Sequence, residues 1–149
     1  MAITKIFPLL SVERIAFLPS TTKENVINEL AQMSEKCVTD VSKFEQTILE
    51  REAIVSTGIG QGFVIPHVKN EYVPNFFITI GVIHDGVDWS ALDNRPVEVV
   101  FMIGGPDGMQ YEYLSVLSKL SLIIKNPKNK EAILKLETPQ DVLNFFEKF

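Results

Sequence analysis

Cysteine and histidine are both scarce in this chain. Cys37 is the single cysteine among 149 residues, so an internal disulfide or a cysteine-based zinc cluster is excluded. A lone thiol is typical of a partly buried apolar residue in a reducing compartment. The two histidines, His67 and His84, do not fall in a spaced cluster of metal ligands. The sequence therefore predicts no metal site.

Long apolar runs and an excess of positive charge are also missing. No segment reaches the roughly 20 apolar residues of a membrane-spanning helix. Residues 1–10 lack the apolar core and the small-residue cleavage site of a signal peptide. We therefore expect a cytoplasmic protein without direct membrane insertion. The net charge of −5 argues against nucleic acid as the main partner, because duplex binding usually needs a basic face.

What the chain does have is core material. Its hydrophobic fraction is 46% and its charged fraction 22%, which are ordinary values for a globular domain. No repeat, low-complexity tract or long linker divides it. We expect residues 1–149 to form one domain.

Short apolar runs alternate with segments of helical spacing. A capping box at Thr21 and Glu24 opens the first expected helix, and Thr138 with Pro139 opens the last. Leu114, Leu117, Leu120 and Ile124 are expected to form the apolar stripe of the longest helix. The expected strands are 14–18, 63–66, 76–83 and 97–103, and the expected helices are 22–37, 42–55, 111–125, 130–136 and one from 139 onward. This interleaving predicts an α/β fold with helices on a mixed sheet.

The most informative stretch is STGIGQGFVIPHVK at residues 56–69. It is not a P-loop, because no Gly-Lys-Ser/Thr follows the glycines and the next element resembles a strand. It is a poor dinucleotide fingerprint, because Phe63 occupies the third glycine position and no helix follows. No Gly-x-Ser-x-Gly elbow surrounds any serine, although a hydrolase triad stays open because serine, histidine and aspartate are all present.

The remaining feature is His67, placed at a strand end beside a glycine-rich loop. Glycines such as Gly58 and Gly60 let main-chain N–H groups approach an anion closely. A neutral imidazole is a competent nucleophile near neutral pH. This arrangement suits phosphoryl transfer onto a ring nitrogen, although a lone histidine at a strand end is more often structural.

The run LERE at 49–52, followed by STGIG-x-G-x-x-IPH at 56–67, resembles the signature of the fructose/mannitol-type enzyme IIA domains. These belong to the bacterial phosphoenolpyruvate-dependent phosphotransferase system, and the nitrogen-regulatory IIA proteins are part of the same group. The segment ALDNRPV at 91–97 and the helix from Tyr111 also match the family. The resemblance covers nearly the whole chain and implies one α/β domain with a mixed sheet sandwiched between helices.

The resemblance also implies roles for individual residues. His67 matches the phosphorylated histidine, which receives its phosphoryl group from the phosphocarrier HPr or its nitrogen-branch relative and passes it to a IIB partner. Arg51 matches an arginine whose donors suit phosphate oxygens. Ser56 and Thr57 are expected to add donors, together with the amides of Gly58 and Gly60. Such a relay needs no cofactor, because the group passes between two side chains.

One position departs from the family. Many members carry a second histidine directly before Leu114, where this chain has Tyr113. A tyrosine can hydrogen-bond to a phosphate or an imidazole but does not supply the same titratable group. The sequence leaves three hypotheses: a phosphocarrier component of sugar uptake, a regulatory protein that binds target proteins according to its phosphorylation state, and a binding module in which His67 is structural.

Overall fold

The computed structural model describes residues 5–54, 58–90 and 94–149, and the side chains of 54 and 58–60 are left out of the description. One six-stranded sheet runs through the molecule in the order β1-β5-β6-β3-β2, with β4 also paired to β6. Its strands are β1 (Ile15–Phe17), β2 (Gly58–Gly60), β3 (Phe63–Val64), β4 (His67–Asn70), β5 (Phe77–Val87) and β6 (Val97–Pro106). Parallel and antiparallel pairs both occur, so the sheet is mixed, as the sequence predicts.

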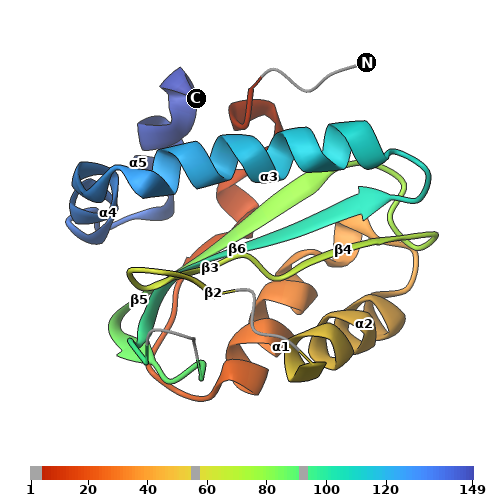
Figure 1. The fold of residues 1–149 in the computed structure, drawn as a ribbon, viewed down its shortest axis with the longest axis horizontal. Helices are drawn as coiled ribbons and strands as arrows, with labels where there is room; N and C mark the ends of the chain where they lie inside the picture. The colour runs from red at the N-terminus through yellow and green to blue at the C-terminus, as the bar shows by residue number, and fades with distance from the viewer. Residues whose placement is uncertain (1–4, 55–57, 91–93) are drawn as a thin grey trace.

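Helices cover both faces of this sheet (Figure 1). The helix α3 lies across one face, near α4 and α5, while α1 and α2 lie across the other. Their bounds are α1 (Lys23–Met33), α2 (Val41–Ile54), α3 (Gln110–Lys125), α4 (Pro127–Leu134) and α5 (Pro139–Phe145), and short 3₁₀ turns occur at Phe7–Leu9, Val12–Arg14, Glu35–Cys37 and Phe146–Lys148. The expected α/β sandwich is therefore confirmed.

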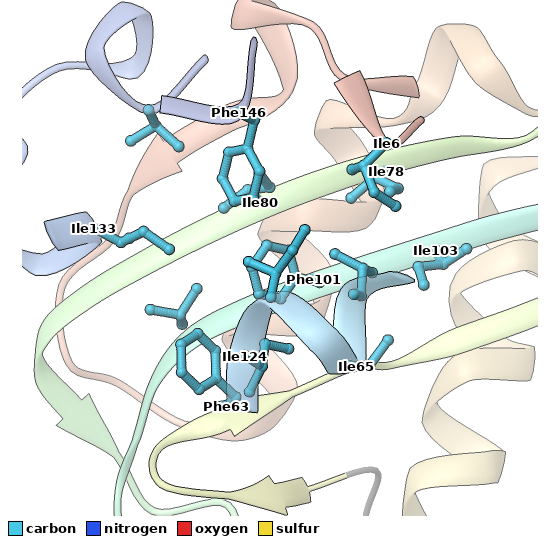
Figure 2. Close-up of a cluster of buried hydrophobic side chains, with 14 of the residues drawn as sticks. Ile6, Phe63, Ile65, Ile78, Ile80, Phe101, Ile103, Ile124, Ile133 and Phe146 are labelled. Atoms are coloured by element: carbon cyan, nitrogen blue, oxygen red, sulfur yellow. The ribbon is translucent and has the colours of Figure 1, made fainter. Parts of the chain in front are cut away.

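The central strands β5 and β6 contribute side chains to two separate hydrophobic cores, because alternate side chains of a strand point to opposite faces of the sheet. Ile80 and Phe101 lie on the α3 side, in the cluster shown in Figure 2, whereas Val100 and Met102 lie on the side of α1 and α2. Both strands are buried on both faces. Their near-continuous apolar sequence follows from that position.

Four of the five helices begin within one residue of the expected position. The exception is α4, which begins at Pro127 rather than at residue 130 because Asn126 caps it and Pro127 takes the first helical position. Thr138 caps α5 by accepting a hydrogen bond from the Asp141 amide. For α1 the expected cap was wrong by one residue, because Thr22 rather than Thr21 accepts the amide hydrogen of Asn25 at 3.1 Å. Two adjacent threonines satisfy the same cap preference, and the backbone places the second one in register.

Several strand ends differ from the expectation. The expected strand 63–66 is shorter and ends at Val64 as β3. The expected strand 97–103 continues as β6 through Gly104 and Gly105 to Pro106. A Cβ on Gly104 would lie 2.4 Å from a ring carbon of Phe77, so glycine is required there by close packing rather than by a turn. The expected strand 76–83 likewise continues past His84 to Val87.

No helix within the described residues is both long enough and apolar enough to cross a membrane.

Candidate functional site

His67 is the first residue of β4 rather than a residue that follows a strand. Both β3 and β4 pair in parallel with β6, and the two short strands are separated by Ile65 and Pro66. The Pro66 carbonyl still accepts the amide hydrogen of Ile103 at 2.9 Å, so this edge stays attached to the sheet. The break places the His67 ring, which is half-buried, at a fixed point beside α2 and α3.

A backbone carbonyl fixes the tautomer of the His67 ring. The Nδ1 atom lies 2.5 Å from the Ile65 carbonyl oxygen. A carbonyl can only accept, so Nδ1 must carry the hydrogen. In the neutral ring the lone pair is then on Nε2, which is the nitrogen that is able to act as a nucleophile.

Arg51 meets that nitrogen from the last turn of α2. Its Nη2 lies 3.2 Å from Nε2 of His67. The side chain is exposed, so the guanidinium can turn from the ring to the oxygens of an incoming phosphoryl group. The structure thus brings together the two residues that the resemblance paired.

The environment keeps the His67 ring neutral. Its pKa lies below the ordinary value of 6.5, chiefly because burial disfavours the charged imidazolium. The Ile65 hydrogen bond raises this pKa, the positive charge of Arg51 lowers it, and the carboxylate of Glu52 raises it, in that order of size. The net effect is a ring with an available lone pair near neutral pH.

Tyr113 covers the ring from α3. The two ring centroids are 5.6 Å apart with the planes tilted by 53°. The tyrosine is 7% exposed, and burial raises its pKa to about 12. Its hydroxyl therefore stays protonated near neutral pH and can donate a hydrogen bond, but it cannot serve as a base there.

Lys69 adds a second cation that the sequence did not single out. It lies two residues after His67 on β4, and its Nζ donates a hydrogen bond to Oε1 of Gln110 at the start of α3. The same ammonium lies 5.6 Å from the centroid of the Tyr113 ring. Spacing by two along a strand places side chains on one face, and that signal could have identified Lys69.

The rest of the expected phosphate-binding loop is described only in part. Ser56 and Thr57 lie outside the described residues. Gly58 and Gly60 form β2, which pairs antiparallel with β3 and has an irregularity between the two glycines. Their role toward a phosphate stays a prediction.

An apolar patch is exposed next to the site at the start of α3. We call Met109, Tyr111 and Leu114, which are 38%, 71% and 53% exposed, the α3 patch. The expected place of Leu114 in the buried stripe of the helix was wrong. Leu120 and Ile124 are buried as expected, and the other buried residues of α3 are Tyr113, Val116 and Ile123.

His84 is exposed and belongs to another region of the molecule. Its ring stacks on Phe17 at 5.6 Å, and its Nε2 lies 3.0 Å from the Leu134 carbonyl oxygen. Among the described residues, no group of three or more His, Cys, Asp or Glu side chains is arranged to hold a metal ion.

This chain is similar in sequence to known proteins. Residues 8–149 match the family described as "Phosphoenolpyruvate-dependent sugar phosphotransferase system, EIIA 2". A fructose-specific EIIABC component of Bacillus subtilis is 36% identical over 97% of this chain, which spans only 24% of that longer protein. A fructose-specific EIIA component of Haloferax volcanii is 31% identical over 95% of this chain and 94% of its own length.

Solved structures show the same fold. A nitrogen regulatory protein IIA-Ntr from Neisseria meningitidis superposes with a TM-score of 0.89 at 24% identity, over 95% of this chain and 98% of that one. A mannitol IIA from Escherichia coli, solved in complex with phosphorylated IIB, superposes with a TM-score of 0.81 at 18% identity, over 94% and 98% of the two chains.

Proposed function

Because the chain belongs to the EIIA 2 family of the phosphoenolpyruvate-dependent sugar phosphotransferase system, we propose that Nε2 of His67 is the atom that carries its phosphoryl group. The single observation that supports this atom is the contact between Nδ1 and the Ile65 carbonyl, which leaves the lone pair on Nε2. The loop residues Ser56, Thr57, Gly58 and Gly60 are proposed to supply further donors. Residues 1–149 are proposed to act as one EIIA domain.

The transfer step is an in-line displacement at phosphorus. The Nε2 lone pair forms a nitrogen–phosphorus bond as the bond between phosphorus and the donor's nitrogen breaks, and that electron pair returns to the donor imidazole. Arg51 would leave the ring and bind the phosphoryl oxygens, which concentrate negative charge in the transition state. The buried Tyr113 hydroxyl, which stays protonated, would be a second donor to those oxygens.

The donor and the acceptor are proposed to be proteins that dock in turn on the same face. The exposed Tyr111 and Leu114 of the α3 patch lie beside Tyr113, and such apolar surface favours protein contacts. The donor would be an HPr-type phosphocarrier in the cytoplasm. The acceptor would be a IIB protein or domain, because the mannitol IIA of similar fold was solved in complex with phosphorylated IIB.

A regulatory role is the second candidate, and Tyr113 is the observation that favours it. Many family members carry a histidine at this position, and the tyrosine here cannot titrate near neutral pH. In that role the phosphorylation state would control binding to target proteins. A IIB or IIC transporter encoded next to this chain would favour sugar uptake, and a neighbouring alternative sigma factor would favour regulation.

Phosphorus NMR of the phosphorylated chain tests the proposed atom. The two phosphohistidine isomers give separate resonances, and selective nitrogen labelling of the ring assigns the bond. We expect the Nε2 isomer. The Nδ1 isomer would show that the Ile65 contact does not fix the reactive tautomer.

A further inference from the structure

Glu52 is a buried carboxylate to which the transfer step assigns no role. It follows Arg51 directly in the last turn of α2, yet its side chain is only 3% exposed while Arg51 is exposed. Burying a carboxylate is costly unless it is paired and hydrogen-bonded. A buried charge at this position therefore calls for a specific partner.

One such partner is Trp89, the single tryptophan of the chain, which is fully buried. Its Nε1 donates a hydrogen bond to Oε2 of Glu52 at 3.0 Å, across 37 residues of sequence. Asp88 and Ser90 hold the tryptophan in a tight turn, because Oδ1 of Asp88 accepts the Ser90 amide hydrogen at 3.0 Å. The ring belongs to the core cluster on the side of α1 and α2, which also contains Phe44 and Ile48.

This contact attaches the end of α2 to the segment that leaves β5. The Arg51 guanidinium is exposed, so its place at His67 depends on where the last helical turn lies. Glu52 is one residue further along the helix, and its hydrogen bond to Trp89 restrains that turn. Misplacing a catalytic group by about 1 Å can slow a reaction by about a hundredfold.

We propose that Glu52 is a positioning residue for phosphoryl transfer: its buried carboxylate, hydrogen-bonded to Trp89, holds the last turn of α2 so that Arg51 meets Nε2 of His67. This inference rests on the proposed function of His67. The two residues also act on the His67 ring through their charges. The Glu52 carboxylate raises the pKa of His67, whereas the Arg51 guanidinium lowers it.

A double-mutant cycle between Arg51 and Glu52 tests the proposal. The readout is the single-turnover rate of phosphoryl transfer from a phosphorylated HPr-type donor to the full chain. Glu52→Ala should slow transfer about tenfold, and Glu52→Gln should recover part of the rate because its amide oxygen can still accept from Trp89. In an Arg51→Ala background, Glu52→Ala should cause little further loss, because Glu52 acts through Arg51.

Two further variants separate positioning from general stability. Trp89→Phe keeps an aromatic ring but removes the Nε1 donor, so it should slow transfer even if Glu52→Ala folds poorly. Phe146→Leu is the matched control, because Phe146 is fully buried in the other core, on the α3 side of the sheet. It should lower the free energy of unfolding and leave the rate unchanged. NMR titration should give a lower His67 pKa in Glu52→Gln than in the parent chain.

The outcomes distinguish this inference from the proposed function. If the parent chain accepts no phosphoryl group on His67, the proposed function fails and the positioning role falls with it. If the parent chain is phosphorylated but the losses from Arg51→Ala and Glu52→Ala multiply fully, Glu52 does not act through Arg51 and only the positioning role is overturned. Parental transfer rates in both folded Glu52→Ala and Trp89→Phe would overturn it as well.

Discussion

The rings of His67 and Tyr113 lie 5.6 Å apart and tilted by 53°, one at the start of β4 and the other in the first turns of α3. The tyrosine thus covers one side of the proposed nucleophile. Because its pKa is raised to about 12, it offers a hydroxyl donor and no base. This chain therefore has an aromatic side chain that does not titrate near neutral pH at the position where many family members have a second, titratable histidine.

Tyr113→Phe separates the hydroxyl from the ring. We expect phosphoryl transfer to slow about tenfold or more, because a hydrogen bond from the hydroxyl to a charged phosphoryl oxygen is worth about 1.5–3 kcal/mol. The free energy of unfolding should change by less than about 1 kcal/mol, because the buried ring is retained. Single-turnover transfer and urea unfolding measure the two effects. An unchanged transfer rate would show that the hydroxyl does not bind the phosphoryl group.

Tyr113→His restores the histidine of the family. We expect the variant to fold and to retain transfer, with a loss of about 1–2 kcal/mol in the free energy of unfolding, because a smaller ring leaves a gap in a site that is only 7% exposed. Thermal unfolding and the transfer assay check this together. Loss of transfer in a folded variant would contradict it.

Arg51→Ala removes the donor that faces Nε2 of His67. Transfer should slow by about a hundredfold, as when one donor to a developing anion is lost. The free energy of unfolding should change by less than about 0.5 kcal/mol, because the side chain is exposed. Arg51→Lys serves as the matched variant and should recover only part of the rate, since an ammonium lacks the bidentate fork. Full activity in Arg51→Ala would show that Arg51 takes no part in phosphoryl transfer.

The pH dependence of stability should reflect His67. Its pKa in the folded chain lies below 6.5, so the unfolded state binds the proton more readily. The free energy of unfolding should therefore fall as pH drops through 6.5 toward the folded-state pKa, and should level off below it. Urea unfolding at a series of pH values measures this slope. His67→Ala should show a shallower slope over the same window, and an identical slope would contradict the assignment.

Removing a neighbouring charge should move the same titration. The positive charge of Arg51 lowers the pKa of His67, so Arg51→Ala should raise that pKa as measured by NMR. Lys69→Met is a comparison variant, because Lys69 instead lies over the Tyr113 ring. A larger shift in Lys69→Met than in Arg51→Ala would indicate that the nearer cation has been misidentified.

Gly104→Ala tests how closely β6 is packed where it pairs with β4, the strand of His67. An added Cβ would lie 2.4 Å from a ring carbon of Phe77, and Gly104 pairs with Val68, the residue after His67. We expect a loss of about 2–3 kcal/mol in the free energy of unfolding and a displaced His67 resonance. Gly108→Ala is the control: its Cβ would meet nothing within 4 Å, and only the positive φ of 79° costs stability, about 1 kcal/mol. Equal losses in both variants would contradict the packing argument.

Much of the fold follows from local sequence. Cap residues such as Thr138 and the apolar runs of β5 and β6 determine elements by interactions within a few residues. Strand ends were less predictable. The expected strand ended at residue 103, yet β6 continues through Gly104 and Gly105 because both pair with β4. Aromatic rings of the neighbouring segment occupy the space that side chains would fill at these two positions.

The site was predictable only where a motif is contiguous. His67 and the glycine loop stand together in the sequence, and Arg51 was paired with His67 through the family resemblance. The hydrogen bond between Glu52 and Trp89 spans 37 residues and depends on the tertiary fold, so no local sequence pattern predicts it. The prediction that Leu114 faces the core failed for another reason. Several leucines of α3 fit the helical period, and only packing decides which of them face the core.

The most direct test of the central claim is phosphoryl labelling of the parent chain and of His67→Ala. Each would be incubated with enzyme I, an HPr-type donor and labelled phosphoenolpyruvate, with an active IIA protein as the control for the donors. We predict an acid-labile, base-stable phosphate that maps to His67 in the parent chain and is absent from the folded variant. Label retained in His67→Ala, or no label in the parent chain while the control is labelled, would contradict the assignment of His67 as the phosphoryl carrier.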